Sequence, residues 1–210
     1  MPATVPKVVV FDLGKVLVDF DYGIAARKIA AQSALGEPGV RQLLDHTPLL
    51  FRYETGLLTR ETFYQEVCAG AGYRGSLREF SGHFADIFWE IEPMISLHAL
   101  LRARGFPTFI FSNTNDLAVT HIRARFPFFS QFDGYIFSYE HGSMKPDAKI
   151  YEAVERATGQ GGNAILYLDD RPENTAAGEA RGWNVVTHET PEKTFQALRR
   201  LGLPVPGPIT

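Results

Sequence analysis

The chain has 210 residues, of which 45% are apolar and 21% charged, and its formal net charge is −3. This composition excludes a disordered or collagen-like protein, and the length allows one domain with a modest insertion. Because 21 basic residues stand against 24 acidic ones and form no basic stripe, we expect no nucleic-acid partner.

The first apolar run, Val8–Phe11, predicts a buried strand that ends at Asp12. Four similar runs follow much later, at Thr108–Phe111, Tyr135–Phe137, Ile165–Leu168 and Val185–Thr187. Each run is continuous, which is typical of parallel strands covered on both faces. Helical patterns are expected at Leu97–Arg104, Asp116–Arg125, Ala148–Ala157, Thr175–Arg181 and Phe195–Leu201. The alternation predicts an α/β fold with a doubly wound, Rossmann-like sheet of five parallel strands.

A long segment, residues 21–92, separates the first expected strand from the second. Its pattern is helical and contains no strand signal. The expected helices are Ile24–Leu35, one within Val40–His46, Thr59–Ala69 and Leu77–Trp89. We interpret this segment as an α-helical cap inserted into a core built from residues 1–20 and 93–210.

Polar side chains follow four of the five expected strands. They are Asp12, Ser112 with Asn113, Lys145 in a longer loop, and Asp169 with Asp170. Ligands of open parallel sheets bind at the carboxyl ends of the strands, so these groups are expected to share one site. A carboxylate such as Asp12 can attack phosphorus, and an acidic pair can hold Mg2+, which prefers oxygen ligands.

The segments that carry these residues resemble the four motifs of the haloacid dehalogenase-like hydrolases. They read Val-Val-Val-Phe-Asp12-Leu-Gly-Lys, Phe-Ile-Phe-Ser112-Asn113, Lys145-Pro-Asp and Tyr-Leu-Asp169-Asp170-x3-Asn174. The stretch Glu54-x-Gly56-x-Leu58-Thr59 is similar to the helical cap of the subgroup that contains glucose-1-phosphate phosphatases and the phosphatase domain of soluble epoxide hydrolases. The resemblance implies a Mg2+-dependent phosphatase for a small phosphorylated metabolite, with a sugar phosphate favoured.

The resemblance also implies a role for each residue. Asp12 would be the nucleophile that forms an aspartyl-phosphate, and Lys145 would offset the charge of the nucleophile and of the phosphoryl group. Mg2+ would be held by Asp12, the backbone carbonyl of Gly14, Asp169 and Asp170. Phosphate would be bound by Ser112, Asn113 and Lys145, while Asn174 would support the metal loop.

Gly14 departs from the pattern of the family. Its phosphatases usually carry a second Asp at this position, which protonates the leaving group, and glycine supplies no such proton. Three functions stay open: a phosphatase for substrates that leave easily, a 2-haloacid dehalogenase, and a non-catalytic phosphate-binding domain in which Lys15 blocks or alters the site. A halide displacement needs no cation, so the acidic pair argues against the second.

The remaining expectations concern the cap and the surroundings of the protein. Asp19 and Asp21 could supply an acid to the site or cap the first cap helix, and capping is favoured. Candidates for lining the substrate site are Phe51, Tyr53 and Trp89. Cys68 is the only cysteine, and no apolar run reaches the roughly 18 residues of a membrane span. We therefore expect a cytoplasmic monomer or weak homo-oligomer with no membrane partner.

Overall fold

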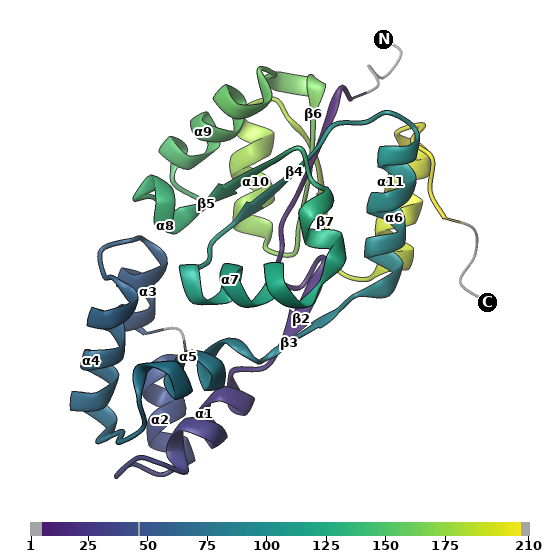
Figure 1. Cartoon of the computed structure of the whole chain (residues 1–210). Helices are drawn as coiled ribbons and strands as arrows, with labels where there is room; N and C mark the ends of the chain where they lie inside the picture. Colours follow the sequence, from purple (N-terminus) through teal and green to yellow (C-terminus); the bar gives the residue numbers. More distant parts are fainter. Residues whose placement is uncertain (1–5, 46, 207–210) are drawn as a thin grey trace.

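A computed structural model describes residues 6–45 and 47–206 and contains a parallel sheet at the centre of its larger part (Figure 1). The strands are β1 (Val8–Phe11), β4 (Thr108–Ser112), β5 (Gly134–Phe137), β6 (Ile165–Asp169) and β7 (Asn184–Thr187). Their order across the sheet is β5-β4-β1-β6-β7, and every neighbouring pair is parallel. The predicted Rossmann-like sheet of five parallel strands is confirmed.

Helices cover both faces of the sheet. One face carries α6 (Glu92–Ala103), α7 (Asp116–Arg125) and α11 (Pro191–Arg200), and the other carries α9 (Ala148–Thr158) and α10 (Pro172–Ala180). Within β1, Val9 and Phe11 belong to the first hydrophobic cluster, whereas Val8 and Val10 belong to the second. This division follows from the two-residue period of a strand. Because both faces are covered, the run of apolar residues is unbroken.

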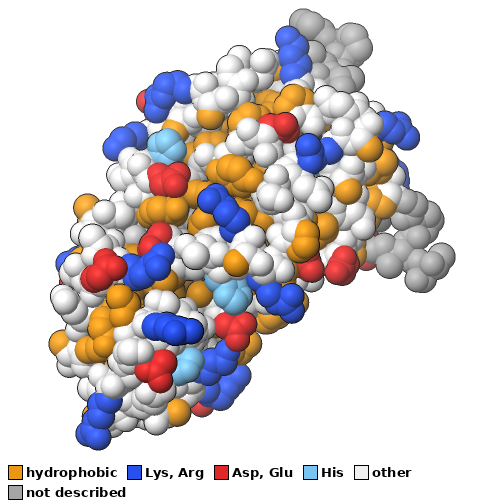
Figure 2. Space-filling view, viewed as in Figure 1, with side chains coloured by type: hydrophobic (Ala, Val, Ile, Leu, Met, Phe, Trp, Pro, Cys, Tyr) orange, Lys and Arg blue, Asp and Glu red, His pale blue; other side chains and the backbone are white. Residues whose placement is uncertain are grey.

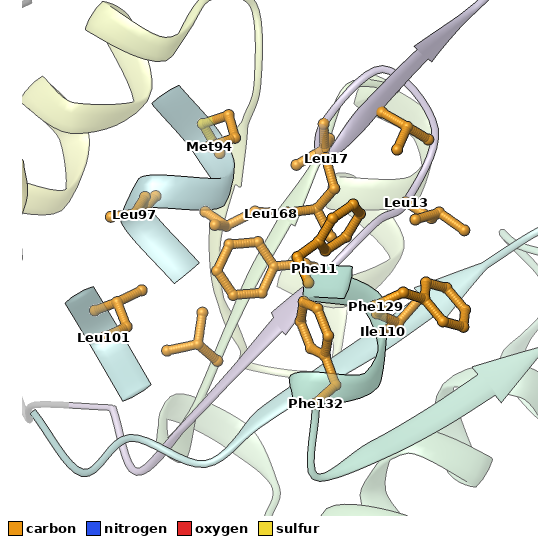
Figure 3. Packing of buried hydrophobic residues seen from close by; sticks show 14 of the residues in the cluster. Phe11, Leu13, Leu17, Met94, Leu97, Leu101, Ile110, Phe129, Phe132 and Leu168 are labelled. Carbon is orange, nitrogen blue, oxygen red and sulfur yellow. The ribbon is translucent and has the colours of Figure 1, made fainter. Parts of the chain in front are cut away.

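Phe11 lies in the middle of the first cluster, next to leucines of α6 and to Phe132 (Figure 3). The rings of Phe11 and Phe132 meet edge to face, with their centroids 6.0 Å apart. Well-packed aromatic side chains of this kind resist displacement. The strand that presents Asp12 therefore ends in a rigid part of the molecule.

The cap forms a second part of the molecule, at the lower left of Figure 1. Its helices are α1 (Tyr22–Ala30), α2 (Glu37–Leu44), α3 (Pro48–Glu54), α4 (Arg60–Ala71) and α5 (Leu77–Ala85). They enclose a hydrophobic cluster of their own, in which the rings of Tyr53, Phe63 and Phe84 lie against one another. The cap thus has its own core.

Two short strands connect the cap to the sheet. They are β2 (Val18–Phe20) and β3 (Phe88–Glu90), and they pair antiparallel. The expectation of no strand within residues 21–92 was wrong, because the helix expected to reach Trp89 ends at Ala85 and β3 follows. A three-residue strand has too short a pattern to detect, and it is stabilised by its partner strand.

Several helix boundaries differ from the prediction. α1 ends at Ala30, before Leu35, and α3 was not predicted. His46, the last residue of the range Val40–His46, lies outside the described residues. α6, α10 and α11 begin several residues earlier than expected. The short remaining elements are η1 (Pro127–Gln131), α8 (Ser138–His141) and η2 (Gly162–Ala164).

Charged side chains of both signs are interspersed over the face shown in Figure 2. Within the described part of the chain, no helix is both long enough and apolar enough to cross a membrane.

Candidate active site

A cavity of about 560 Å³ lies at the carboxyl edge of the sheet. Its walls include seven residues from the predicted motifs: Asp12, Gly14, Ser112, Asn113, Lys145, Asp170 and Asn174. From the cap, the cavity receives Tyr22, Leu50, Phe51 and Glu54. The fold thus brings residues from distant parts of the sequence into one enclosure between sheet and cap.

Lys145 connects two of the carboxylates. Its Nζ lies 3.0 Å from Oδ1 of Asp12 and 2.6 Å from Oδ2 of Asp169, and it also donates to the carbonyl of Phe111 at 3.0 Å. The lysine side chain is buried, as are both acids. A buried ammonium with three oxygen partners is fixed in position and cannot act as a mobile surface charge.

Asp169 is fully buried and accepts hydrogen bonds from several protein donors. Its Oδ2 accepts hydrogen bonds from Nζ of Lys145 and from the hydroxyl of Tyr167. Its Oδ1 accepts one from the backbone N–H of Arg171 at 2.8 Å. Nδ2 of Asn174 lies 2.9 Å from Oδ1 and 3.1 Å from Oδ2. Asn174 therefore orients Asp169, and the oxygens of Asp169 are largely occupied by the protein itself.

The pKa shifts follow from burial and from Lys145. Burial raises the pKa of Asp12 well above its usual range, and the charge of Lys145 opposes this rise. Burial alone would also raise the pKa of Asp169, but Lys145 and hydrogen bonds bring it below its usual value. Asp170 has a raised pKa because of burial and the charge of Asp169. Concentrated negative charge thus opposes the ionisation of a further carboxylate here.

The three acids form a candidate metal site. Asp12, Asp169 and Asp170 each offer a carboxylate oxygen, and these oxygens all lie within 4.8 Å of one another. Three carboxylates and one lysine leave two negative charges, so a divalent cation fits the charge balance. Mg2+ also fits the oxygen chemistry of Asp12, Asp170 and the carbonyl of Gly14. Because the oxygens of Asp169 already accept hydrogen bonds from protein donors, this carboxylate is better suited to positioning its neighbours than to binding the metal directly.

The space next to Gly14, beside the nucleophile, is bordered by the ring of Phe20. A Cβ at this position would approach the ring of Phe20 to 3.0 Å, which is closer than ordinary contact. The Phe20 ring packs against Tyr22 and Phe88, with centroid separations of 5.6 and 5.8 Å. An aromatic side chain therefore borders the position from which the family's usual acid would project.

Lys15 is held by neighbouring groups. It has a φ of 58°, its ammonium pairs with Asp19, and it donates to the carbonyl of Phe20 at 3.1 Å. The expectation that Asp19 caps the first cap helix was wrong, because Asp21 is the N-cap residue and accepts from the N–H of Gly23 at 2.7 Å. Lys15 borders the cavity while its charge is offset by Asp19.

Ser112 and Asn113 lie at the end of β4. The side chain of Asn113 makes two hydrogen bonds with the backbone of Lys145. Nδ2 of Asn113 donates to the carbonyl of Lys145 at 3.0 Å, and the N–H of Lys145 donates to Oδ1 of Asn113 at 2.8 Å. This amide therefore positions the loop that carries the lysine. The Ser112 hydroxyl makes only a long contact, 3.4 Å, with the carbonyl of Asn113 and borders the cavity.

The cap contributes residues that sequence reasoning did not single out for the site. Tyr22 and Glu54 line the cavity, whereas Tyr53 is buried and donates to Asp116, and Trp89 is exposed on β3. Of the three lining candidates, only Phe51 borders the cavity. Glu54 belonged to the motif that resembled the cap of the family, but nothing in its spacing indicated that it lines the same cavity as Asp12.

Comparison with known proteins gives consistent results. The family model of the haloacid dehalogenase-like hydrolases matches residues 6–182. The sesquiterpene phosphatase astK of Aspergillus oryzae is 24% identical over 179 residues, which cover 84% of this chain and 86% of that protein.

Two solved structures share the fold. A predicted HAD-like hydrolase of Porphyromonas gingivalis superposes with a TM-score of 0.78 at 24% identity, over 94% of this chain and 98% of the other. A HAD family enzyme of Bacteroides thetaiotaomicron, in complex with magnesium and inorganic phosphate, gives 0.77 at 21% identity, over 88% and 94%. Both similarities cover the sheet domain and the cap together.

Proposed function

Since this chain belongs to the haloacid dehalogenase-like hydrolases, we propose that it is a Mg2+-dependent phosphatase that hydrolyses a small phosphomonoester through a phosphorylated Asp12. The observation that carries the proposal is the buried bridge from Lys145 to Asp12 and Asp169, next to a third carboxylate, Asp170. This arrangement combines a nucleophile, a fixed cation and a site for a divalent ion at one edge of the sheet.

The residues divide the chemistry among themselves. Asp12 attacks phosphorus, and Lys145 offsets the negative charge of Asp12 and of the transferring phosphoryl group. Ser112 and the backbone N–H groups after β4 bind phosphate oxygens. Asp12, Asp170 and the carbonyl of Gly14 would hold Mg2+, which would neutralise negative charge on the phosphoryl oxygens when bound. Asp169 and Asn174 keep Lys145 in position.

The leaving group of the substrate is bound by the cap. A sugar phosphate, the class favoured by the sequence, would meet the hydroxyl of Tyr22 and the carboxyl of Glu54. The other cap residues at the cavity, Leu50 and Phe51, are apolar, and Phe20 and Met144 add to this wall. The wall favours a second class, monophosphates with a hydrocarbon group, and the match to a sesquiterpene phosphatase supports testing it.

A panel of monophosphates tests the proposal. We expect phosphate release from at least one member of a set of sugar 1-phosphates, sugar 6-phosphates and prenyl or aryl monophosphates in the presence of Mg2+. EDTA should abolish the release and added Mg2+ should restore it. Asp12→Asn should lower turnover to background, whereas Glu179→Gln, at an exposed acid of α10, should leave it unchanged.

The alternatives give different results in the same assays. Halide release from a 2-haloacid that is insensitive to EDTA would identify a dehalogenase. No turnover of any member, together with Mg2+-dependent binding of inorganic phosphate, would identify a phosphate-binding domain. The expected cytoplasmic location and the monomeric or weakly associated state stay predictions.

A further inference from the structure

The cavity contains a carboxyl group that the proposed chemistry has not used. Among the described residues that line it, the acids are Asp12, Asp170 and Glu54. Asp12 is assigned to nucleophilic attack and Asp170 to the cation, so Glu54 is left without a role in the bond-making and bond-breaking steps. At the same time, Gly14 offers no group to protonate the leaving oxygen, a contribution typically worth about 10² to 10⁴ in rate.

We propose that Glu54, from the last turn of α3 in the cap, is the general acid and base of the reaction in place of the side chain missing at Gly14. This assignment rests on the proposed phosphatase function. It means that the proton donor belongs to the cap, whereas the nucleophile belongs to the sheet.

The position of Glu54 supports this role. It borders the large cavity together with Asp12, and it borders a second cavity of about 60 Å³ together with Gly14 and Phe20. Glu54 therefore faces the side of the site from which the usual acid would project. Glu54 approaches this side from the cap, whereas a side chain at position 14 would have to displace the edge of the Phe20 ring by a few tenths of an ångström.

A residue of the core holds Glu54 in place. Asn115, the N-cap residue of α7, accepts from the N–H of Ala118 at 3.0 Å through its Oδ1 and also hydrogen-bonds the Glu54 carboxyl. Asn115 is itself buried. A cap side chain that is fixed by a core side chain has a defined geometry when the cap covers the substrate.

The protonation of Glu54 suits an acid. Burial raises the pKa of Glu54 to about 8, although the Asn115 hydrogen bond opposes this rise. The carboxyl group is therefore mostly neutral near pH 7 and has a proton to donate. Tyr22 is the other proton donor from the cap in this cavity, but burial raises its pKa well above the usual value. A phenol of that kind is a weaker acid than an ordinary tyrosine, so it donates a proton to the leaving oxygen less readily than Glu54 does.

The two half-reactions balance with Glu54 in this role. In the first, an Asp12 oxygen forms a bond to phosphorus, the bond between phosphorus and the leaving oxygen breaks, and the Glu54 proton moves to that oxygen. In the second, Glu54 as carboxylate takes a proton from water while the water oxygen bonds to phosphorus. The bond from phosphorus to Asp12 breaks, which releases inorganic phosphate and restores both acids.

Glu54→Gln tests the assignment, because glutamine keeps the shape and the hydrogen bond but has no acidic proton. The matched control is Glu61→Gln, an exposed acid of the same cap. Two substrates of similar size, 4-nitrobenzyl phosphate and 4-nitrophenyl phosphate, differ in how much their leaving oxygens need a proton. We expect Glu54→Gln to lower kcat on the nitrobenzyl ester by about 10² to 10³.

The nitrophenyl ester provides a readout other than steady-state activity. The nitrophenyl oxygen leaves without being protonated, so Glu54→Gln should release about one nitrophenol per active site in a rapid burst. Further release should be slow, because the variant has no base to take a proton from the water that hydrolyses the phosphorylated Asp12. Intact-mass spectrometry should then detect one phosphoryl group on the variant protein and none on Glu61→Gln.

Three outcomes would overturn the assignment. Equal rates for Glu54→Gln, Glu61→Gln and the unmodified protein on both esters would show that Glu54 moves no proton. An equal loss on both esters without a burst would show that it only supports the structure. If the unmodified protein hydrolyses neither ester nor any member of the panel above, the phosphatase function fails first and the role of Glu54 falls with it.

Discussion

Asp169 and Asp170 are neighbours in sequence but differ in what surrounds them. Asp169 is surrounded by protein donors, whereas Asp170 borders the cavity and has a pKa raised by burial and by the charge of Asp169. The Asp169 carboxylate therefore has its hydrogen-bond partners without a metal, whereas the Asp170 carboxylate experiences electrostatic repulsion that a bound cation would offset. The same residue type at adjacent positions thus has opposite consequences for stability.

We expect Asp170→Asn and Asp169→Asn to shift stability in opposite directions. Without Mg2+, Asp170→Asn should raise Tm because it removes repulsion, and it should abolish the increase in Tm that Mg2+ gives the unmodified protein. Asp169→Asn should lower the free energy of unfolding by about 3 kcal/mol, because Lys145 loses a buried partner. Differential scanning calorimetry with and without Mg2+ measures both. A lower Tm for Asp170→Asn without metal would contradict the repulsion.

His98 gives the protein a pH dependence outside the site. It is buried, its ring stacks on Phe132 at 3.8 Å, and Nε2 lies 3.1 Å from Oγ1 of Thr108. Burial lowers the pKa of His98 to about 4. The unfolded chain therefore binds a proton between pH 6.5 and 4 that the folded protein does not bind at this residue. The contribution, about 3 kcal/mol, is present above pH 6.5 and is lost as the pH falls toward 4.

His98→Phe should remove this dependence. The phenyl ring keeps the stacking and cannot titrate, so the free energy of unfolding of the variant should fall less steeply than that of the unmodified protein between pH 6.5 and 4. Urea unfolding at a series of pH values measures the difference. Parallel curves for the two proteins would rule out His98 as the source.

Gly56 determines how closely the cap element approaches the sheet domain. It follows α3, has a φ of 74°, and a Cβ there would lie 2.1 Å from the carbonyl oxygen of Tyr139 in α8. Only a residue without a side chain allows this contact. The glycine two residues after Glu54 therefore sets the position of the C-terminal end of α3 against the core.

Gly56→Ala should destabilise the protein and impair the cap. The left-handed backbone costs about 1 kcal/mol for alanine, and the contact with Tyr139 adds to it. We expect a lower free energy of unfolding and a raised KM for the substrate found in the panel. Gly82→Ala is the matched control, because a Cβ at that position in α5 meets nothing within 4 Å; it should be neutral or stabilising by about 0.5–1 kcal/mol. Equal stability of the two variants would contradict the close approach.

The elements that the sequence predicts are those whose own residues carry the signal. β1, β4 and β6 are buried on both faces, and their continuous apolar runs mark them. Helices that open with Pro in the first turn begin before their apolar pattern does, which explains the late predicted starts of α6, α10 and α11.

The residues of the site also differ in how far the sequence alone predicts their positions. Asp12, Lys145 and Asp170 follow strands of one parallel sheet, so topology alone brings them together. The position of Glu54 depends on how α3 packs against α7 and α8. That is a tertiary contact, and no local pattern encodes it.

The two parts of the molecule are joined by more than the strands β2 and β3. Asp116, at the start of α7 in the sheet domain, accepts the hydroxyl of Tyr53 and pairs with Arg60 at 2.7 Å, and both partners belong to the cap. Leu117, next to it, belongs to the hydrophobic cluster of the cap. α7 therefore contributes to both cores and holds the cap over the cavity.

Asp116→Ala should loosen this junction. It leaves the Tyr53 hydroxyl and Arg60 without their acceptor, which we expect to cost about 1–3 kcal/mol. Hydrogen exchange should become faster in α3 and α4 while the amides of β1 and β6 keep their protection. Asp147→Ala, at an exposed position that makes no capping hydrogen bond, serves as the control and should change neither. Equally faster exchange throughout the chain would show that α7 does not act as a local junction.

The contact between Gly14 and Phe20 has a consequence for the evolutionary history of the chain. An aspartate introduced at position 14 alone would bring its Cβ to 3.0 Å from the Phe20 ring, so the ring would have to shift by a few tenths of an ångström, whereas a smaller residue at position 20 would leave room for it. The effect of one substitution therefore depends on the presence of the other, which geneticists call epistasis. The aspartate is therefore expected to be tolerated better beside a smaller residue at position 20 than beside the aromatic ring. Libraries that vary both positions together should recover combinations that single-site libraries do not reach.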